Sequence, residues 1–156
     1  MILEIDEFIN NLPQKCRILG LDLGSKTIGL ALSDPARTIA SPIETIRRKK
    51  FTQDAEQLEE IIKKRDVGAL ILGLPTNMDG SEGPRCQSTR QFARNISKRG
   101  LDIPISFWDE RLSTSAVERF LVDEAEMSRA KRGQVVDKMA ASFILQGALD
   151  MMQIKR

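Results

Sequence analysis

Acidic residues occupy three places in the sequence from which carboxylates could converge on one site. Asp22 ends the first apolar run, Asp109 and Glu110 end the last short one, and Asp137 falls near the expected start of the final helix. Converging carboxylates repel one another unless a cation lies between them, and oxygen ligands suit Mg²⁺ and Mn²⁺. Two such ions can activate a water and stabilise the leaving oxygen during phosphodiester cleavage. The acids therefore indicate metal-dependent hydrolysis of a phosphodiester.

Each of these acids also has a purely structural interpretation. An Asp near a Gly is typical of a turn, so Asp22 could serve only the chain reversal. Asp137 could simply favour the positive end of a helix. The run Asp109-Glu110-Arg111 could form surface salt bridges. Taken one at a time, the acids do not decide between structure and catalysis.

The segment DLGSKT, residues 22–27, is more specific than any single acid. An Asp-x-Gly-Ser/Thr turn between antiparallel strands aims a carboxylate and several backbone N–H groups at one point, where phosphate could bind. The alternative is an ordinary hairpin with glycine in a left-handed conformation. The turn also resembles the phosphate-binding turn of ATPases and sugar kinases. That superfamily pairs two such domains around the nucleotide, whereas these 156 residues provide only one.

The composition excludes several classes of catalyst and partner. The sequence contains no histidine, which excludes a histidine-based serine triad, a Cys–His pair, a His-ligated zinc centre and a histidine general base. No Tyr is present and aromatic residues make up 4%, so stacking platforms for single-stranded nucleic acid are not expected. The formal charge of +2 favours no partner by itself. Cys16 and Cys86 are expected to be reduced thiols.

Sequence periodicity predicts which elements position the acids. The patterns predict strands over 17–23, 27–33, 39–46, 67–74 and 103–109, and helices over 1–13, 51–65, 85–98, 113–122 and 135–152. Thr52 is the expected cap of the second helix, and a charged irregular segment is expected over 124–133. Because their connections are short, the first three strands are expected to form an antiparallel meander. The order predicts one α/β domain with a mixed sheet flanked by helices.

Four blocks of the sequence, in the same order, resemble the RuvX (YqgF) family of ribonuclease H-like proteins. The blocks are LGLDLGSKTIGLALSD (19–34), LILGLPTNMDGSEGPR (70–85), WDERLSTSAVE (108–118) and VVDKMAASFIL (135–145). The family is described both as Holliday junction resolvases and as nucleases that mature pre-ribosomal RNA. The resemblance implies a ribonuclease H-like fold for residues 16–156: a five-stranded mixed sheet, three antiparallel strands followed by parallel ones. Residues 1–15 lie outside the matched core and form an N-terminal extension, expected to be a short peripheral helix.

By position in these blocks, the resemblance assigns catalysis and metal binding to Asp22, Glu110 and Asp137. Asp109 is the alternative to Glu110, although a regular strand would point it to the opposite face. The expected cofactor is Mg²⁺ or Mn²⁺. The residues expected to contact the substrate are Lys26, Asn77, Arg85, Arg111, Lys131 and Lys138. A rigid connector is an equally good interpretation of the loop that contains Asn77. The basic run RRKK at 47–50 could extend a nucleic-acid track or form a solvated face.

The leading hypothesis is a metal-dependent nuclease acting on structured nucleic acid, with processing of the 5′ end of pre-16S rRNA as its expected task. The runner-up is Holliday junction resolution, which requires a symmetric dimer. A non-catalytic ribosome-assembly factor and an ATPase or sugar-kinase relative are further alternatives. The expected partners are structured RNA, branched DNA and ribosome precursors, for a monomer or a homodimer. No membrane contact is expected, because no apolar run reaches about 18 residues. The acidic N-terminus lacks a secretion signal, so the expected location is cytoplasmic.

Overall fold

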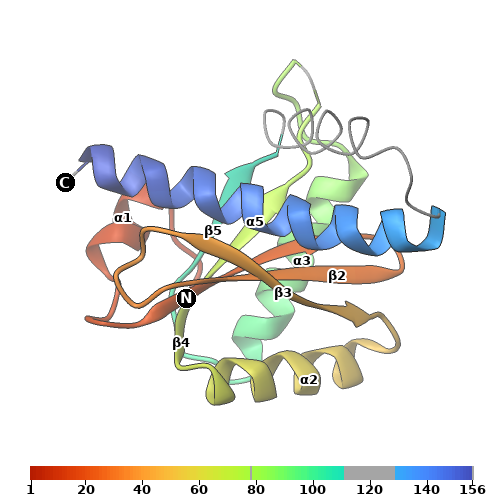
Figure 1. The fold of residues 1–156 in the computed structure, drawn as a ribbon, viewed down its shortest axis with the longest axis horizontal. Helices are drawn as coiled ribbons and strands as arrows, with labels where there is room; N and C mark the ends of the chain where they lie inside the picture. Colours follow the sequence, from red (N-terminus) through yellow and green to blue (C-terminus); the bar gives the residue numbers. More distant parts are fainter. Residues whose placement is uncertain (78, 111–128, 156) are drawn as a thin grey trace.

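The protein is built around a mixed five-stranded sheet. The computed structural model describes residues 1–77, 79–110 and 129–155, and within the last helix it describes side chains from 139 to 154. The strand order is β3-β2-β1-β4-β5 (Figure 1). The pairs β1–β2 and β2–β3 are antiparallel and the pairs β1–β4 and β4–β5 are parallel, which confirms the predicted mixed sheet of three antiparallel strands followed by parallel ones. The strands are β1 (Arg17–Leu23), β2 (Thr27–Ser33), β3 (Ala40–Arg47), β4 (Val67–Leu74) and β5 (Ile105–Asp109).

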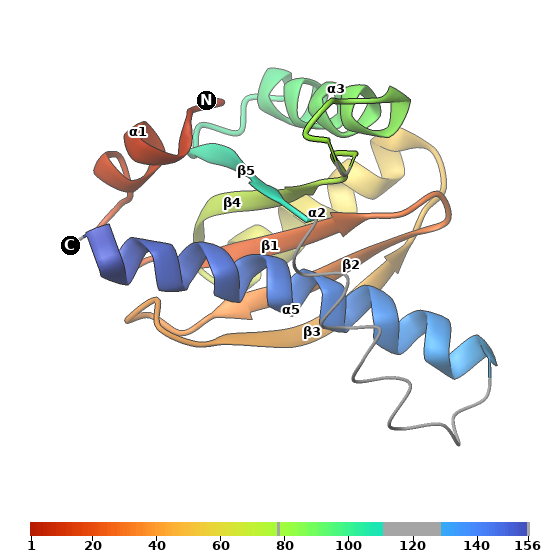
Figure 2. The ribbon, with the colours of Figure 1, turned by 90° about the horizontal axis from the view of Figure 1, so that it is seen from above.

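Helices cover both faces of this sheet. Helix α5 runs across one face, and α2 and α3 lie on the other (Figure 2). The described helices are α1 (Ile5–Asn10), α2 (Phe51–Lys64), α3 (Pro84–Lys98) and α5 (Arg129–Lys155). Among the described residues, no helix has both the length and the apolar character needed to cross a membrane.

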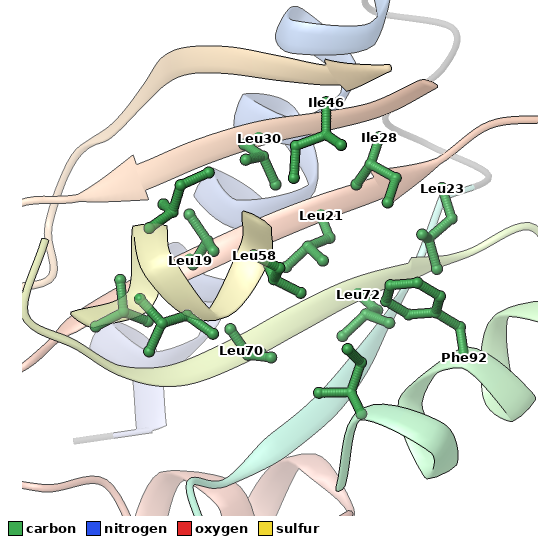
Figure 3. Close-up of a cluster of buried hydrophobic side chains, with 14 of the residues drawn as sticks. Leu19, Leu21, Leu23, Ile28, Leu30, Ile46, Leu58, Leu70, Leu72 and Phe92 are labelled. Carbon is green, nitrogen blue, oxygen red and sulfur yellow. The ribbon is translucent and has the colours of Figure 1, made fainter. Parts of the chain in front are cut away.

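Two apolar clusters, one on each face, hold the layers together. On the α2 and α3 face, Leu58 of α2 and Phe92 of α3 belong to one buried cluster with Leu21 of β1 (Figure 3). On the other face, α5 contributes Ala141 and Leu145. Since β1 and β4 are buried on both sides, they have the continuous apolar sequences expected of central strands. Burial on two faces holds β1 and β4 at the centre of the sheet, and with them the positions of their carboxyl ends.

Glycine allows α5 to approach the sheet closely. A Cβ atom added at Gly20 of β1 would lie 2.8 Å from Leu145 Cβ and 3.1 Å from the backbone oxygen of Ala141. Any side chain at this position would push the helix away from β1. The path of α5 over the centre of the sheet therefore depends on this glycine.

The N-terminal segment does more than form a short helix. The predicted helix over 1–13 is limited to α1, because residues before it run beside β5. Leu3 N donates to Ile105 O at 2.8 Å, and Ile105 N donates to Met1 O at 2.8 Å. The side chain of Phe8 is fully buried, in the same cluster as α5. The segment thus covers the outer edge of the sheet, while the division of the chain at residue 15 stays a prediction.

Three predictions about the helices need correction or lie outside the structure. Helix α5 begins at Arg129, so residues 129–133 are helical rather than irregular, and Gly133 lies inside the helix. An interior glycine costs about 1 kcal/mol, which a long packed helix can absorb. The N-cap of α2 is Lys50 rather than Thr52, and Asp54 Oδ1 accepts the N–H of Lys49 at 2.9 Å. The predicted helix over 113–122 lies outside the described residues.

Candidate active site

Asp22 lies near the carboxyl end of β1, between two glycines on the neighbouring strands. On one side it pairs with Gly29 of β2. On the other side, the pairing of Leu21 with Leu72 brings Gly73 of β4 level with it. Because β1, β4 and β5 are parallel, their carboxyl ends meet at one edge, where open α/β sheets place their sites.

Glu110 follows β5 and reaches this glycine-lined position. Its backbone N–H donates to Leu74 O at 3.1 Å, which fixes the chain as it leaves the strand. A Cβ added at Gly73 would lie 2.5 Å from Glu110 Oε1 and 2.4 Å from Ile144 Cδ1. Only a glycine therefore leaves room for the Glu110 side chain between β4 and α5.

The carboxyl groups of Asp22 and Glu110 interact directly. Burial, a side-chain hydrogen bond with Asp22 and the charge of Asp22 together raise the pKa of Glu110 to about 8, while the charge of Arg85 opposes the rise. One proton is therefore held between the two carboxyl groups at neutral pH. An acid pair of this kind binds a hard divalent cation readily, because the cation removes the repulsion that the proton otherwise relieves.

Asp109 faces a different neighbour. Thr76 Oγ1, in the loop after β4, donates to Asp109 Oδ1 at 2.7 Å. Asp109 also lines a separate cavity of about 340 Å³ together with Leu3 and Phe107. The neighbouring Glu110 side chain, by contrast, forms a hydrogen bond with Asp22.

Asp137 lies in the third turn of α5, because the helix begins at Arg129. The prediction that Asp137 lies in the first turn was wrong. The interpretation of Asp137 as a residue that stabilises the helix dipole is therefore wrong too, since the interaction of a charge with the helix dipole falls off within one turn. The side chain of Asp137 is outside the described part of the structure. Among described side chains, no group of three or more potential metal ligands is found. The role of Asp137 stays a prediction.

The basic and polar residues predicted to contact substrate have different surroundings. Lys26 is exposed in the turn between β1 and β2, and Arg85 is exposed in the first turn of α3. Asn77 Nδ2 donates to Ser81 Oγ at 3.0 Å, and its backbone N donates to Ser81 O at 2.9 Å, so Asn77 closes its own loop. Arg111 and the side chains of Lys131 and Lys138 lie outside the described part.

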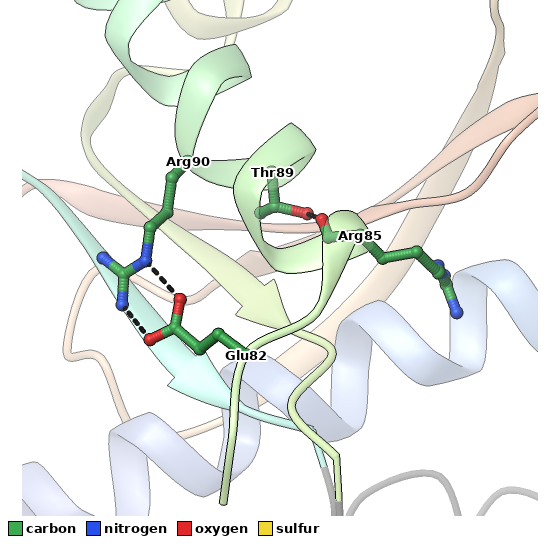
Figure 4. Close-up of polar contacts among 4 residues, drawn as sticks. All are labelled: Glu82, Arg85, Thr89 and Arg90. Carbon is green, nitrogen blue, oxygen red and sulfur yellow. Dashed lines mark hydrogen bonds and ion pairs between the residues drawn. The ribbon is translucent and has the colours of Figure 1, made fainter.

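The start of α3 is held by hydrogen bonds and an ion pair in which the Arg85 guanidinium takes no part. Thr89 Oγ1 donates to Arg85 O at 3.0 Å. Arg90 donates to both carboxylate oxygens of Glu82 at 2.7 and 2.8 Å. The side chain of Arg85 points away from this ion pair (Figure 4). It faces the turn that follows Asp22, where it lines a cavity.

That cavity contains residues that sequence reasoning did not assign to the site. It has a volume of about 210 Å³ and lies against the β1–β2 turn. Its lining residues are Leu23, Gly24, Ser25, Arg48, Arg85, Ser88, Thr89 and Phe92. Arg48 belongs to the basic run at 47–50, but the run alone could not show which of its members turns inward. Nothing in the sequence singled out Ser88.

Comparisons with known proteins agree with this geometry. A family model described as "RuvX: Holliday junction resolvase" matches residues 16–151. A protein of Ruegeria sp. (strain TM1040), named "Putative pre-16S rRNA nuclease", is 61% identical over 95% of this chain and 93% of its own length. A protein of Paramagnetospirillum magneticum with the same name is 63% identical over 96% of this chain and 95% of its own.

Solved structures show the same fold at low sequence identity. The T. thermophilus RuvC in complex with a Holliday junction substrate has a TM-score of 0.54 at 12% identity, covering 88% of this chain and 96% of that one. The yeast mitochondrial Holliday junction resolvase Ydc2 has a TM-score of 0.55 at 11% identity, covering 96% and 84%. These likenesses establish the ribonuclease H-like fold.

Proposed function

Because this chain belongs to the RuvX family and is by that membership a nuclease, we propose that it is a divalent-metal-dependent enzyme that processes the 5′ end of pre-16S rRNA. The observation that carries the proposal is the hydrogen-bonded pair of Asp22 and Glu110 at the carboxyl edge of the sheet. The choice of pre-16S rRNA as substrate is supported by the name of two relatives, which are 61% and 63% identical to this protein over nearly the whole chain. The proposed location is cytoplasmic, with ribosome precursors as partners.

Asp22 and Glu110 would hold Mg²⁺ or Mn²⁺, and we propose Asp137 as the third ligand. Its place on α5 supports this: it precedes Ala141 by four residues and Ile144 by seven, so all three lie on one face of the helix. Ala141 lies against Gly20 of β1. A bound ion would activate a water and stabilise the leaving oxygen.

The residues of the chain itself perform the remaining tasks of catalysis. The Asp22–Glu110 pair gives up its shared proton when it binds a cation, so metal affinity should rise with pH. The apolar cover that Ile144 provides over Gly73 limits water around Glu110 and strengthens its electrostatic interactions. Arg85 and Lys26 stand at the same edge and would offset the negative charge of the substrate phosphates.

Cleavage by the Asp22→Asn variant tests this proposal. Wild-type protein in Mg²⁺ should cut precursor 16S rRNA, and the variant should be slower by at least about 100-fold, because the pair loses a carboxylate. Asp102→Asn is the matched control. Asp102 is exposed and precedes the amino end of β5, whereas the site lies at the carboxyl end of that strand. Equal cleavage by Asp22→Asn and wild type would rule out the assigned site. Salt-sensitive RNA binding with no cleavage by wild type would instead indicate a non-catalytic assembly factor.

A second candidate function is Holliday junction resolution, favoured by the description of the matching family model. A resolvase cuts two strands in symmetric positions and is therefore expected to be a dimer. A four-way DNA junction, assayed beside the precursor RNA, separates the two functions. Paired symmetric cuts by a dimer of this chain would favour the junction, and trimming of RNA by a monomer would favour rRNA processing.

A further inference from the structure

The cavity beside the β1–β2 turn is positively charged and lies next to the acid pair. It is formed where the turn after Asp22 meets the first turns of α3. Two arginines, Arg48 and Arg85, reach it from β3's end and from α3. None of the described residues that line it is acidic. Its charge therefore suits an anion.

Arg48 is held in place by contacts that do not neutralise it. Its Nη1 donates to Gly24 O at 2.6 Å, and its guanidinium carbon lies 5.9 Å from the centroid of the Phe92 ring. Both partners are uncharged, so the positive charge of the guanidinium is fixed at the cavity wall. A side chain that is already ordered loses little entropy when it binds a ligand.

Arg85 connects the cavity to the acid pair. Arg85 lines the cavity, and the charge of its guanidinium also acts on the Glu110 carboxyl. Ser25 and Ser88, both exposed, add hydroxyl groups to the same wall. Leu23 and Gly24, which directly follow Asp22 in the chain, also line the cavity, so a phosphate bound there would lie close to a phosphate at the acid pair.

The cavity offers little to a nucleobase. Phe92 is only 5% exposed and Arg48 lies over its ring, so no open aromatic face is available for stacking. The volume of about 210 Å³ exceeds what a phosphate alone requires and leaves room for an attached sugar. Leu23 and Phe92 supply the apolar part of the lining.

We propose that this cavity, given the nuclease function proposed above, binds an internal backbone phosphate of the substrate strand, adjacent to the phosphate that is cleaved. Arg48 and Arg85 bind the phosphate oxygens, and the serine hydroxyls donate to them. Recognition is independent of base sequence, because only the backbone enters the cavity. The site fixes the position of the strand relative to the acids.

The test measures RNA binding without cleavage. A short fluorescein-labelled RNA is titrated in EDTA with each protein, and fluorescence anisotropy gives Kd. Ser88→Glu places a carboxylate at the cavity and should raise Kd at least about tenfold by repelling the phosphate. Gln87→Glu is the matched control, since Gln87 is the exposed neighbour on α3, makes the same charge change and does not line the cavity. Arg48→Gln should also weaken binding and reduce the slope of log K against log salt by about 0.7.

The same titration with RNA that carries a 5′-terminal phosphate or a 5′-hydroxyl distinguishes two sources of phosphate. Equal weakening by Ser88→Glu with both RNAs supports an internal phosphodiester. Weakening only with the 5′-phosphorylated RNA would overturn the proposal in favour of a terminal phosphate. Equal Kd values for Ser88→Glu and Gln87→Glu would overturn it altogether, and would leave the Asp22→Asn cleavage result untouched. Conversely, cleavage by Asp22→Asn would refute the proposed function without affecting this binding measurement.

Discussion

Replacing Glu110 by Gln should stabilise the metal-free protein at high pH while it removes cleavage. In the folded protein the pKa of Glu110 is raised from 4.5 to about 8, first by burial and then by the hydrogen bond and charge of Asp22. The folded state therefore keeps a proton that the unfolded chain releases. Ionising this carboxyl beside Asp22 costs folding free energy, and a neutral amide avoids that cost while still donating to Asp22.

The sign and size of the effect follow from proton linkage. A carboxyl whose folded pKa is raised imposes no penalty below pH 4.5, an increasing penalty between 4.5 and 8, and a constant one above 8. At about 1.4 kcal/mol for each pH unit, the raised pKa of Glu110 corresponds to at most about 5 kcal/mol. Because this carboxyl keeps partial contact with solvent, screening reduces the value, and we expect about 2 to 3 kcal/mol.

Urea unfolding in EDTA at a series of pH values measures this difference. Wild type and Glu110→Gln should be about equally stable at pH 4 and should diverge through neutral pH, with the variant more stable at pH 9. Glu56→Gln, which changes an exposed carboxylate on α2, should follow wild type at every pH. Added Mg²⁺ should recover stability in wild type, by about 2.7 kcal/mol at one hundred times its Kd, but not in Glu110→Gln. Parallel stability profiles of wild type and Glu110→Gln across pH would refute the contact between Glu110 and Asp22 that underlies the site.

Three further predictions follow from the packing. Gly73→Ala should abolish cleavage and lower the free energy of unfolding by about 1 to 3 kcal/mol, since the added methyl would meet atoms at 2.4 and 2.5 Å. The control Gly83→Ala should keep both cleavage and stability, because its nearest contact would lie at 3.7 Å. Phe8→Ala should lower the free energy of unfolding by about 3 to 5 kcal/mol, because this ring is fully buried, and a loss below about 1 kcal/mol in urea titration would show that the N-terminal segment is not docked. Asp109→Asn should retain most cleavage where Glu110→Gln abolishes it, because the amide oxygen still accepts from the loop after β4; the reverse ranking would assign the site to Asp109.

Much of the fold could be predicted because it depends on local pattern. The run VGALILGL at 67–74 became β4, a strand buried on both faces, since continuous apolar residues of that length suit such a place. The short connections after β1 and β2 left only antiparallel pairing for the first three strands. The start of α5 was placed too late because Gly133 argues locally against a helix, whereas the four residues before it, Arg-Ala-Lys-Arg, are strong helix formers and the helix continues through the glycine.

The sequence by itself determined which chemistry was open to this protein. Without histidine, and with acids at the ends of strands, the sequence predicted carboxylates and a hard cation as the route to phosphodiester hydrolysis. The tertiary structure decided which neighbours each side chain meets. Glu110 reaches Asp22 because its side chain lies over Gly73, where no Cβ blocks it, and Arg48 faces the cavity because Gly24 and Phe92 hold it there. Such contacts join residues far apart in the chain, and their geometry depends on how the strands and helices pack rather than on any local spacing.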